Sequence, residues 1–280
     1  MRKALAAPVY AVAIVLLAAG TAPSQDRQEL ERGLQAQYVG KYWLIRGFYE
    51  GADLRFDGTG KLVKGKAQQP WTIAGVEIVS LKLHDNEVEI DANRVAYVYD
   101  SAKRKFTRTY RVVQRNRKQE TEKLKIRLET PSSADEAGLR QTLDNVLIAD
   151  NKPVLSEVPE YWRDFLANTD KEEDARFAAF ADTGEVYRIG GGVKAPRPAS
   201  TPDPKYTDPA RLARFQGTVI LAMVIDRTGH PKEVIVLRPL GFGLDDMAVA
   251  AVNGWRFKPA ERDGNPIAVR MRVEISFRLY

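Results

Sequence analysis

The 280-residue sequence contains no cysteine and only two histidines, His84 and His230. The lack of cysteine excludes a disulfide, a thiolate metal site and a cysteine nucleophile. It also excludes a lipid-modified cysteine at the N-terminus. The two histidines do not have a spacing that is typical of shared metal ligation. We therefore predict that both are surface residues, and that the protein has no metal site and no cofactor.

The sequence also lacks the motifs of common hydrolases and nucleotide-binding enzymes. It contains no G-x-S-x-G nucleophile motif. Gly241-Phe242-Gly243 is followed by Asp245 and Asp246, which place negative charge where a dinucleotide loop would hold phosphate. These aspartates suit the dipole of a following helix instead, and Asp245 is predicted to cap it. Gly190-Gly191-Gly192 lacks the Ser or Thr of a phosphate loop and predicts a flexible joint. We therefore predict that the protein is not an enzyme.

The composition, with 44% hydrophobic and 29% charged residues, is typical of a globular protein. The net charge of +6 is a mild basic bias, and the length allows two domains and a targeting segment. Arg2 and Lys3 precede an uncharged stretch from Ala4 to Pro23. This pattern predicts an export signal over residues 1–24.

Two interpretations of this signal remain open. Cleavage at the small residues 20–24 would leave a soluble periplasmic protein. Retention of the uncharged stretch would instead tether the protein to the inner membrane, with its positive end in the cytoplasm. Both interpretations place the rest of the chain in the periplasm.

Residues 38–130 contain short apolar runs that are separated by turn residues such as Asp57-Gly58-Thr59-Gly60. Strands at this spacing predict a β-rich domain over residues 38–130, built as an antiparallel barrel or sandwich. A short amphipathic helix is predicted before it, over residues 25–37.

The β-rich domain contains a dense basic run that only Glu120 and Glu122 balance. The run includes Lys103, Arg104, Lys105, Arg108, Arg111, Arg115, Arg117 and Lys118. One interpretation is the solvated face of a hairpin, whose charges prevent edge pairing. The other is a patch for an anionic partner such as phospholipid head groups or acidic glycan. Nucleic acid is not expected as a partner, because the export signal removes the protein from it.

Residues 131–192 predict a helical connector region. Helices are expected over residues 135–147, from residue 159, and over residues 171–180, followed by a strand over residues 186–189. Five prolines then lie between Ala195 and Pro209. They predict a stiff connector rather than part of a core.

The last part of the chain predicts strand, turn, strand, helix and long strand. Residues 218–225 are apolar on both faces, which favours a central strand, and residues 233–237 predict its hairpin partner. The closing strand alternates strictly from Val269 to Leu279, so it should have one dry and one wet face. Placing the first strand in the middle of three leaves the closing strand at an edge. An open edge is an aggregation liability or a docking site.

Several short motifs in this region resemble one known family. They are Pro204-Lys205-Tyr206, Ala210-Arg211, Gln216-Gly217-Thr218-Val219, Asp226 with Gly229, Leu244-Asp245, and Trp255-Arg256-Phe257-Lys258-Pro259. Together they resemble the TonB C-terminal domain over about residues 193–280. The predicted fold class is therefore α+β, in which the β-rich domain precedes a TonB-like domain with a three-stranded antiparallel sheet and helices on one face.

The resemblance implies a periplasmic domain whose last strand accepts an extended segment, the TonB box, from an outer-membrane transporter. The sequence departs from the family in three places. Asp203 stands where the family often has Gln, the N-terminal stretch has no His and no Ser before Ser24, and the proline-rich spacer is short. The polar anchor residues of the family engage a proton-driven motor in the inner membrane.

Two functions remain open. The first is a TonB-like protein that supports energy-coupled transport, by strand addition to a transporter and through the inner-membrane motor proteins. Its predicted partner-binding residues are Arg270, Met271, Arg272, Val273, Glu274, Ile275, Ser276 and Phe277, with Asp203, Pro204 and Tyr206 in the Pro-x-Tyr region. Arg270, Arg272 and Arg278 either favour acidic segments or keep the strand soluble. The second is a periplasmic scaffold that transmits no force and pairs with a partner or with itself as a homodimer.

Overall fold

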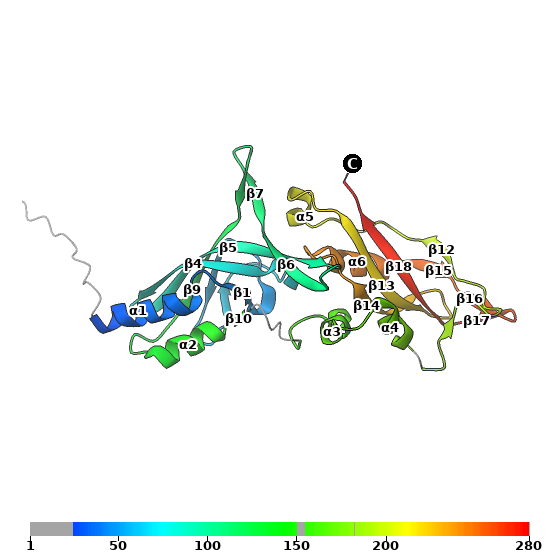
Figure 1. Cartoon of the computed structure of the whole chain (residues 1–280), viewed down its shortest axis with the longest axis horizontal. Coiled ribbons are helices and arrows are strands. Elements are labelled where there is room, and N and C mark those ends of the chain that lie inside the picture. The colour runs from blue at the N-terminus through cyan, green and yellow to red at the C-terminus, as the bar shows by residue number, and fades with distance from the viewer. Residues whose placement is uncertain (1–24, 150–154, 182, 280) are drawn as a thin grey trace, which may run out of the picture.

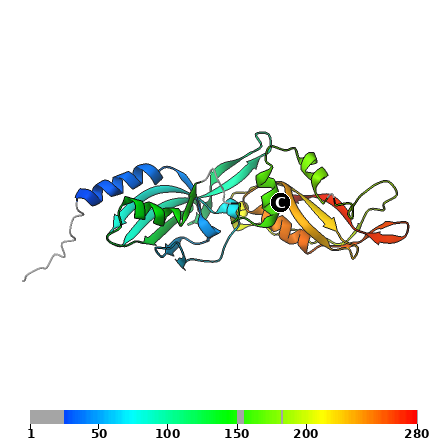
Figure 2. The same ribbon diagram turned by 90° about the horizontal axis from the view of Figure 1, so that it is seen from below.

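The computed structural model describes residues 25–149, 155–181 and 183–279. The molecule is elongated, and its two largest β-sheets follow one another along its long axis (Figures 1 and 2). The predicted signal or anchor over residues 1–24 lies outside the described residues. Within the described ranges, no helix has the length and apolarity needed to cross a membrane.

The N-terminal sheet has eight strands, in the order β10-β1-β4-β5-β9-β2-β3, with β6 also paired to β5. The strands are β1 (Tyr42–Ile45), β2 (Asp53–Phe56), β3 (Leu62–Lys64), β4 (Gly75–His84), β5 (Glu87–Asp100), β6 (Lys105–Tyr110), β9 (Lys123–Glu129) and β10 (Leu147–Ala149). Among the described residues, the end strands β10 and β3 do not pair with each other. The sheet is therefore open, and the predicted barrel is wrong. The β2–β9 pair is parallel, so the sheet is mixed rather than antiparallel.

Two helices contribute side chains to the N-terminal core: α1 (Gln25–Tyr38) and α2 (Glu136–Asp144). Leu34 and Tyr38 of α1 and Leu139 and Leu143 of α2 are buried with the apolar side chains of the sheet. The alternation along β5 produces this arrangement, because Val88, Ile90 and Ala92 point inward while their neighbours do not. A single sheet covered by helices thus replaces the predicted sandwich.

A hairpin leaves the N-terminal sheet between β6 and β9. Its strands, β7 (Val112–Arg115) and β8 (Lys118–Thr121), pair only with each other. It projects from the body of the molecule (Figure 1). We call this hairpin, residues 112–121, the arm.

The C-terminal sheet has the order β11-β18-β13-β14. Its strands are β11 (Tyr187–Arg188), β18 (Val269–Phe277), β13 (Gly217–Ile225) and β14 (Pro231–Arg238). The apolar run of β13 lies between β14 and β18, and all of β18 from Val269 to Phe277 pairs with it. The fourth strand, β11, was not predicted as part of this sheet.

Helices cover both faces of the C-terminal sheet, so the predicted single covered face is wrong. On one face α6 (Leu244–Asn253) packs against β13. On the other face, Phe177 of α4 (Glu173–Ala179) and Phe180 pack against Ile220 and Ala222. The sequence predicted that β13 is apolar on both faces. One face packs against α6, and the other packs against α4 and Phe180.

The proline-rich stretch is folded onto the C-terminal half rather than free. Its strand β12 (Arg197–Ser200) pairs with β15 (Arg256–Lys258), and α5 (Asp208–Leu212) follows. A small hairpin of β16 (Ala260–Arg262) and β17 (Asn265–Ile267) completes the C-terminal half. One proline of the predicted stiff connector, Pro198, therefore lies in a paired strand opposite Phe257, so this stretch is not a free connector.

The two halves share one hydrophobic cluster. Trp71 and Tyr97 from the N-terminal half, Trp162 of α3 (Glu160–Ala167) and Phe242 belong to it. Two backbone hydrogen bonds join β5 to the loop before α6: Tyr99 N donates to Leu240 O at 3.1 Å, and Phe242 N donates to Tyr97 O at 2.9 Å. The two halves are therefore packed against each other through this cluster and these hydrogen bonds.

Glycine is required at this junction. Gly241 has a φ of +92°, and a Cβ atom there would lie 2.2 Å from Tyr97 O. Any larger residue would push β5 away from the loop. The sequence therefore uses glycine here for close packing between the halves and not for a phosphate.

Candidate partner-binding edge

The outer edge of β18 is paired over only a small part of its length. On that side, β11 pairs in parallel with Val269 and Arg270. From Met271 to Phe277, no strand in the described part of the chain occupies this side. A row of backbone N–H and C=O groups therefore remains available along this part of the strand. We call Met271–Phe277 the open edge.

The opposite edge of the sheet, along β14, is covered. Helix α3 lies against β14, and Trp162 and Phe165 of α3 are fully buried in the cluster that includes Val236. The guanidinium of Arg176 in α4 donates to the carbonyl oxygen of Leu237. One strand edge is thus protected by helices, while the other is left accessible.

Arg270 was predicted to lie on the wet face of the edge strand, and this prediction is wrong. Its side chain is only 3% exposed, its guanidinium donates to Phe180 O, and it lies over the Phe177 ring at 6.0 Å. Its backbone is paired with Arg188 of β11. Arg270 therefore holds the segment after α4 and does not belong to the open edge.

The other predicted cations differ from one another. Arg272 is exposed, but its Nη1 lies 2.7 Å from Asp174 Oδ1 and 3.5 Å from Glu173 Oε1. These carboxylates neutralise it locally, so Arg272 fixes α4 over the sheet. Arg278 is exposed beyond the end of β18. The positive charge expected along the strand is therefore much reduced.

The remaining side chains of the open edge alternate between two environments. Met271 and Val273 are partly buried against the α6 side, where Ile275 and Phe277 are buried. Glu274 and Ser276 are exposed on the α4 side. An added strand would meet apolar side chains on one face and polar ones on the other.

The Pro-x-Tyr region lies at the end of β18. The Tyr206 ring packs edge-to-face on Phe277 with centroids 5.4 Å apart, and burial raises the pKa of Tyr206. Asp203 is exposed and Pro204 is partly buried. Tyr206 therefore supports the last residue of the open edge, and its predicted partner contact stays a prediction.

Asp245 does not cap α6 as predicted. Gly243 occupies the N-cap position with a φ of 76°. The fully buried Asp245 carboxylate accepts hydrogen bonds from Leu240 N at 2.7 Å and Gly241 N at 2.8 Å, and burial raises its pKa to about 7. Its role is to hold the loop that contacts β5.

Asp246 joins α6 to α3. Its Oδ1 accepts a hydrogen bond of 2.6 Å from the Tyr161 hydroxyl. Burial raises the pKa of this carboxyl group to about 6. This contact could not be predicted from local sequence patterns, because Tyr161 lies 85 residues upstream of Asp246.

The predicted basic patch is divided among separate places. Lys103 pairs with Asp100 at 3.0 Å, Arg104 with Glu172 at 2.7 Å, and Arg108 lies over the Tyr42 ring at 4.1 Å. Arg111 is buried and pairs with Glu122 at 2.9 Å. Lys105 is exposed on β6. Only Arg115, Arg117 and Lys118 gather in one place, at the tip of the arm.

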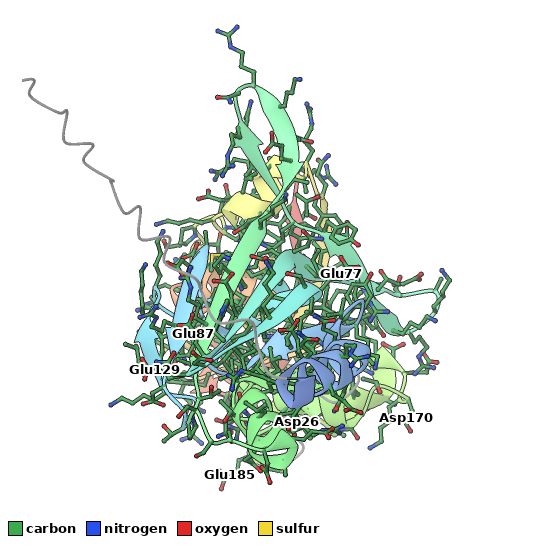
Figure 3. All side chains as sticks on the ribbon, turned by 90° about the vertical axis from the view of Figure 1, so that its left-hand side faces the viewer. Asp26, Glu77, Glu87, Glu129, Asp170 and Glu185 are labelled. Atoms are coloured by element: carbon green, nitrogen blue, oxygen red, sulfur yellow. The ribbon has the colours of Figure 1, made fainter. Side chains whose placement is uncertain are left out.

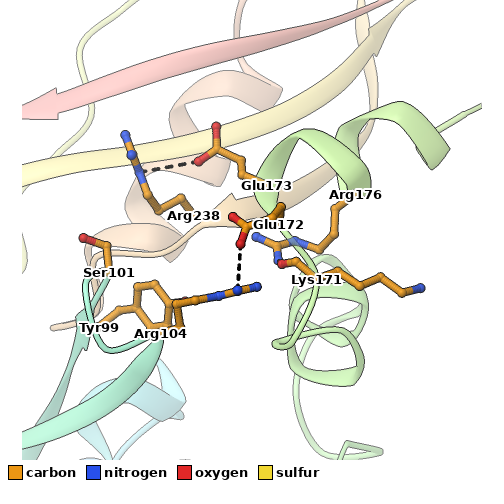
Figure 4. Close-up of a pocket in the computed structure, with 8 residues that line it drawn as sticks. All are labelled: Tyr99, Ser101, Arg104, Lys171, Glu172, Glu173, Arg176 and Arg238. Atoms are coloured by element: carbon orange, nitrogen blue, oxygen red, sulfur yellow. Dashed lines mark hydrogen bonds and ion pairs between the residues drawn. The ribbon is translucent and has the colours of Figure 1, made fainter.

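Figure 4 shows a charged pocket of about 170 Å³ near the junction of the halves. The residues that line it are Tyr99, Ser101, Arg104, Lys171, Glu172, Glu173, Arg176 and Arg238. Two of its arginines have carboxylate partners, since Arg238 Nε lies 3.7 Å from Glu173 Oε2 and Arg104 pairs with Glu172. Arg176 donates to backbone carbonyls of Asn168, Lys171 and Leu237. These cations therefore hold the two halves and α4 together.

Neither histidine has a metal-binding environment. His84 ends β4, and the His230 Nδ1 lies 2.8 Å from the Thr228 hydroxyl in the β13–β14 turn. Within residues 25–149, 155–181 and 183–279, no group of three potential ligand side chains could hold a metal ion.

Two comparisons with known proteins, a family model and a curated relative, match the C-terminal half. The family model described as the Gram-negative bacterial TonB protein C-terminal domain matches residues 202–279. Protein TonB of Vibrio cholerae serotype O1 is 34% identical over 77 residues, which cover 27% of this chain and 32% of that protein. The chain therefore spans about a third of the length of this curated relative.

Among solved structures, the chain matches the solution NMR structure of the Pseudomonas aeruginosa TonB C-terminal domain. The sequence identity is 18%, the match covers 33% of this chain and 93% of that domain, and the TM-score is 0.25. The family model and the curated relative carry the assignment. Residues 202–279 of this chain form a TonB C-terminal domain.

Proposed function

We propose that this protein engages an outer-membrane transporter by adding a strand of the transporter to the open edge of β18. The observation that supports this most directly is the contrast within one sheet. Helix α3 and Arg176 cover β14, while Met271–Phe277 has no partner strand among the described residues on its outer side. Main-chain hydrogen bonds would supply the affinity of the added strand.

The side chains beside the open edge define the segment that fits. Apolar residues at alternate positions would lie next to Met271, Val273 and Ile275. Polar residues between them would lie next to Glu274 and Ser276. A short extended segment with this alternation is the proposed ligand.

Strand β11 defines where such a segment begins. It already occupies the same side of β18 opposite Val269 and Arg270, in parallel orientation. The chain then leaves the sheet at Ile189, which is 43% exposed, and turns through Gly190 and Gly191, both with positive φ. A partner strand that continues the track of β11 would run parallel to β18, from Met271 toward Phe277.

The wider role that we propose is TonB-type support of energy-coupled transport from the periplasm. In this proposal residues 193–280 dock the transporter, residues 38–130 form the β-rich domain and residues 131–192 connect them. The protein acts by binding rather than by catalysis. Retention of residues 1–24 would anchor it in the inner membrane beside the motor proteins.

The second candidate is a periplasmic scaffold that transmits no force. The observation that favours it is the pairing of β12, in the proline-rich stretch, with β15. A strand that is paired in this way does not act as a long spacer across the periplasm. In this case the open edge would pair with the same edge of a second copy, since an isologous contact needs no other partner.

Site-directed disulfide formation tests the first candidate, because the chain contains no cysteine of its own. Glu274→Cys would be oxidised with synthetic TonB box peptides that carry one cysteine at successive positions. We expect cross-links at alternate peptide positions, because side chains of a strand alternate between its faces. Lys232→Cys on the covered strand β14 is the matched control and should not react with this pattern.

Equal cross-linking at residues 232 and 274, or no alternation along the peptide, would contradict strand addition. Rapid disulfide-linked dimerisation of Glu274→Cys without peptide, together with dimers of the unmodified protein in sedimentation, would support the second candidate instead.

A further inference from the structure

The arm is separate from both sheets and extends beyond the body of the molecule (Figures 1 and 3). A two-stranded hairpin is only marginally stable by itself in water. The arm must therefore be held by contacts at its base and along its side, and these contacts are visible in the structure.

The base of the arm is held by two buried arginines, Arg94 of β5 and Arg111. Their backbones form a closed set of hydrogen bonds with Glu122: Arg94 N to Glu122 O at 2.7 Å, Arg111 N to Arg94 O at 3.0 Å, and Glu122 N to Arg111 O at 2.8 Å. The Arg111 side chain pairs with Glu122 at 2.9 Å and donates to Ile73 O at 2.7 Å. The Arg94 side chain donates to Gly51 O at 2.7 Å. Buried ion pairs and hydrogen bonds of this kind fix the direction of the arm.

The side of the arm is held by the C-terminal half. Gln119 Nε2 donates to Leu212 O at the end of α5 at 2.9 Å. The arm is thus attached to both halves of the molecule, and it presents its tip in a fixed orientation.

The tip carries positive charge that the protein does not neutralise. Arg115, Arg117 and Lys118 are exposed, and in the described part of the chain they form no ion pair. Asn116 and Arg117 have φ values of 50° and 62°, as a tight hairpin turn requires. The nearest carboxylate on β8, that of Glu120, lies toward the base, where Glu122 is already paired with Arg111.

We propose that the tip of the arm binds the head groups of anionic phospholipids. The tip is the end of a two-stranded hairpin that projects from the body of the molecule (Figure 1), so its cations can meet a flat charged surface together. A layer of phosphate groups requires only that several cations reach one plane, and Lys or Arg near such a surface is attracted without a fitted pocket. This surface is separate from the open edge of β18 and does not depend on its proposed role.

The test measures binding of the full chain to vesicles of phosphatidylglycerol with phosphatidylcholine and to vesicles of phosphatidylcholine alone. The variant R115Q/R117Q/K118Q should weaken binding to the anionic vesicles by on the order of 100-fold. Binding of the unmodified chain should fall when the ionic strength rises from about 0.01 M to about 1 M. Residues 1–24 are the same in the unmodified chain and in the variants. Any binding of this segment to lipid therefore contributes equally to the proteins that are compared.

The matched control is K66Q/K82Q/K232Q, which removes the same charge from exposed positions away from the arm. It should retain anionic binding. Equal losses in both triple variants, or equal binding of the unmodified chain to both kinds of vesicle, would overturn the proposal. So would a tip-dependent affinity for poly-glutamate without affinity for the anionic vesicles, since it would indicate an acidic protein partner.

Discussion

The two edges of the C-terminal sheet differ in how much of their length other elements cover. The β14 edge is covered by α3 and by a hydrogen bond from Arg176. The β18 edge is covered by β11 only at Val269 and Arg270. A protein that needed only solubility would protect both edges. This difference is the basis of our proposal that the exposed part of β18 binds a partner strand, and the predictions below test it.

The largest effect is expected from Trp162→Ala, which removes the main apolar anchor of α3. Trp162 is fully buried and packs edge-to-face on Trp71 at 5.2 Å. Loss of a large buried aromatic side chain typically costs about 3–5 kcal/mol. Urea unfolding should show this loss of stability. A change below about 1 kcal/mol would mean that α3 does not hold the β14 edge closed.

The next effect concerns pH, through the contact of Asp246 with Tyr161 of α3. Burial raises the pKa of Asp246 from its ordinary value of 3.8 to about 6. The carboxyl group thus contributes stability below about pH 4, and this contribution is lost as the pH rises to about 6 and above. Asp246→Asn is neutral throughout. Its free energy of unfolding, relative to that of the unmodified protein, should rise by about 3 kcal/mol from pH 3.5 to pH 7.5.

The measurement is urea unfolding of both proteins at a series of pH values. If the difference in free energy of unfolding between the two proteins does not change with pH, the pKa of Asp246 is not raised by burial. Asp135→Asn, at an exposed helix cap, is a suitable control because its carboxylate is not enclosed.

A smaller effect is expected from Arg176→Met, which keeps an unbranched side chain but removes the donor to Leu237 O. An unsatisfied buried carbonyl costs about 1–3 kcal/mol. The measurement is urea unfolding together with hydrogen exchange along β14. Exchange in β14 should become faster, while that of β18 stays as it was. Equal acceleration in both strands would indicate general loosening instead of opening of one edge.

The smallest effect on stability is expected from Glu274→Lys on the open edge. This side chain is exposed, so the free energy of unfolding should change by less than about 0.5 kcal/mol. Peptide selection should nevertheless change, because the charge beside the added strand is reversed. Competition between acidic and basic TonB box peptides measures this. An unchanged preference would exclude Glu274 from the binding surface.

The sequence predicted those parts of the C-terminal half that depend on local periodicity. The apolar run of β13, the alternation of β18 and the helix predicted between the second and the closing strand all correspond to elements of the structure. The position of β13 between β14 and β18 was also predicted, because a strand that is apolar on both faces is buried on both faces and belongs in the middle of a sheet.

The sequence did not predict what packs on these elements. Alternation placed Arg270 on the polar face, but it gave no information that α4 and Phe180 cover that position. The basic run looked continuous, yet folding buries Arg111 at the base of the arm and leaves Arg115 at its tip. The proline-rich stretch looked extended because its strand partner β15 lies far along the chain. All three errors arise from contacts between distant segments.

Hydrogen exchange of the β18 backbone tests the central claim most directly. Before a TonB box peptide is added, alternate N–H groups from Met271 to Phe277 should exchange rapidly, since their outer side has no partner strand in the described structure. After it is added, these amides should become protected while those of β14 do not change. Protection of every β18 amide in the free protein, or no alternate gain on binding, would contradict the account.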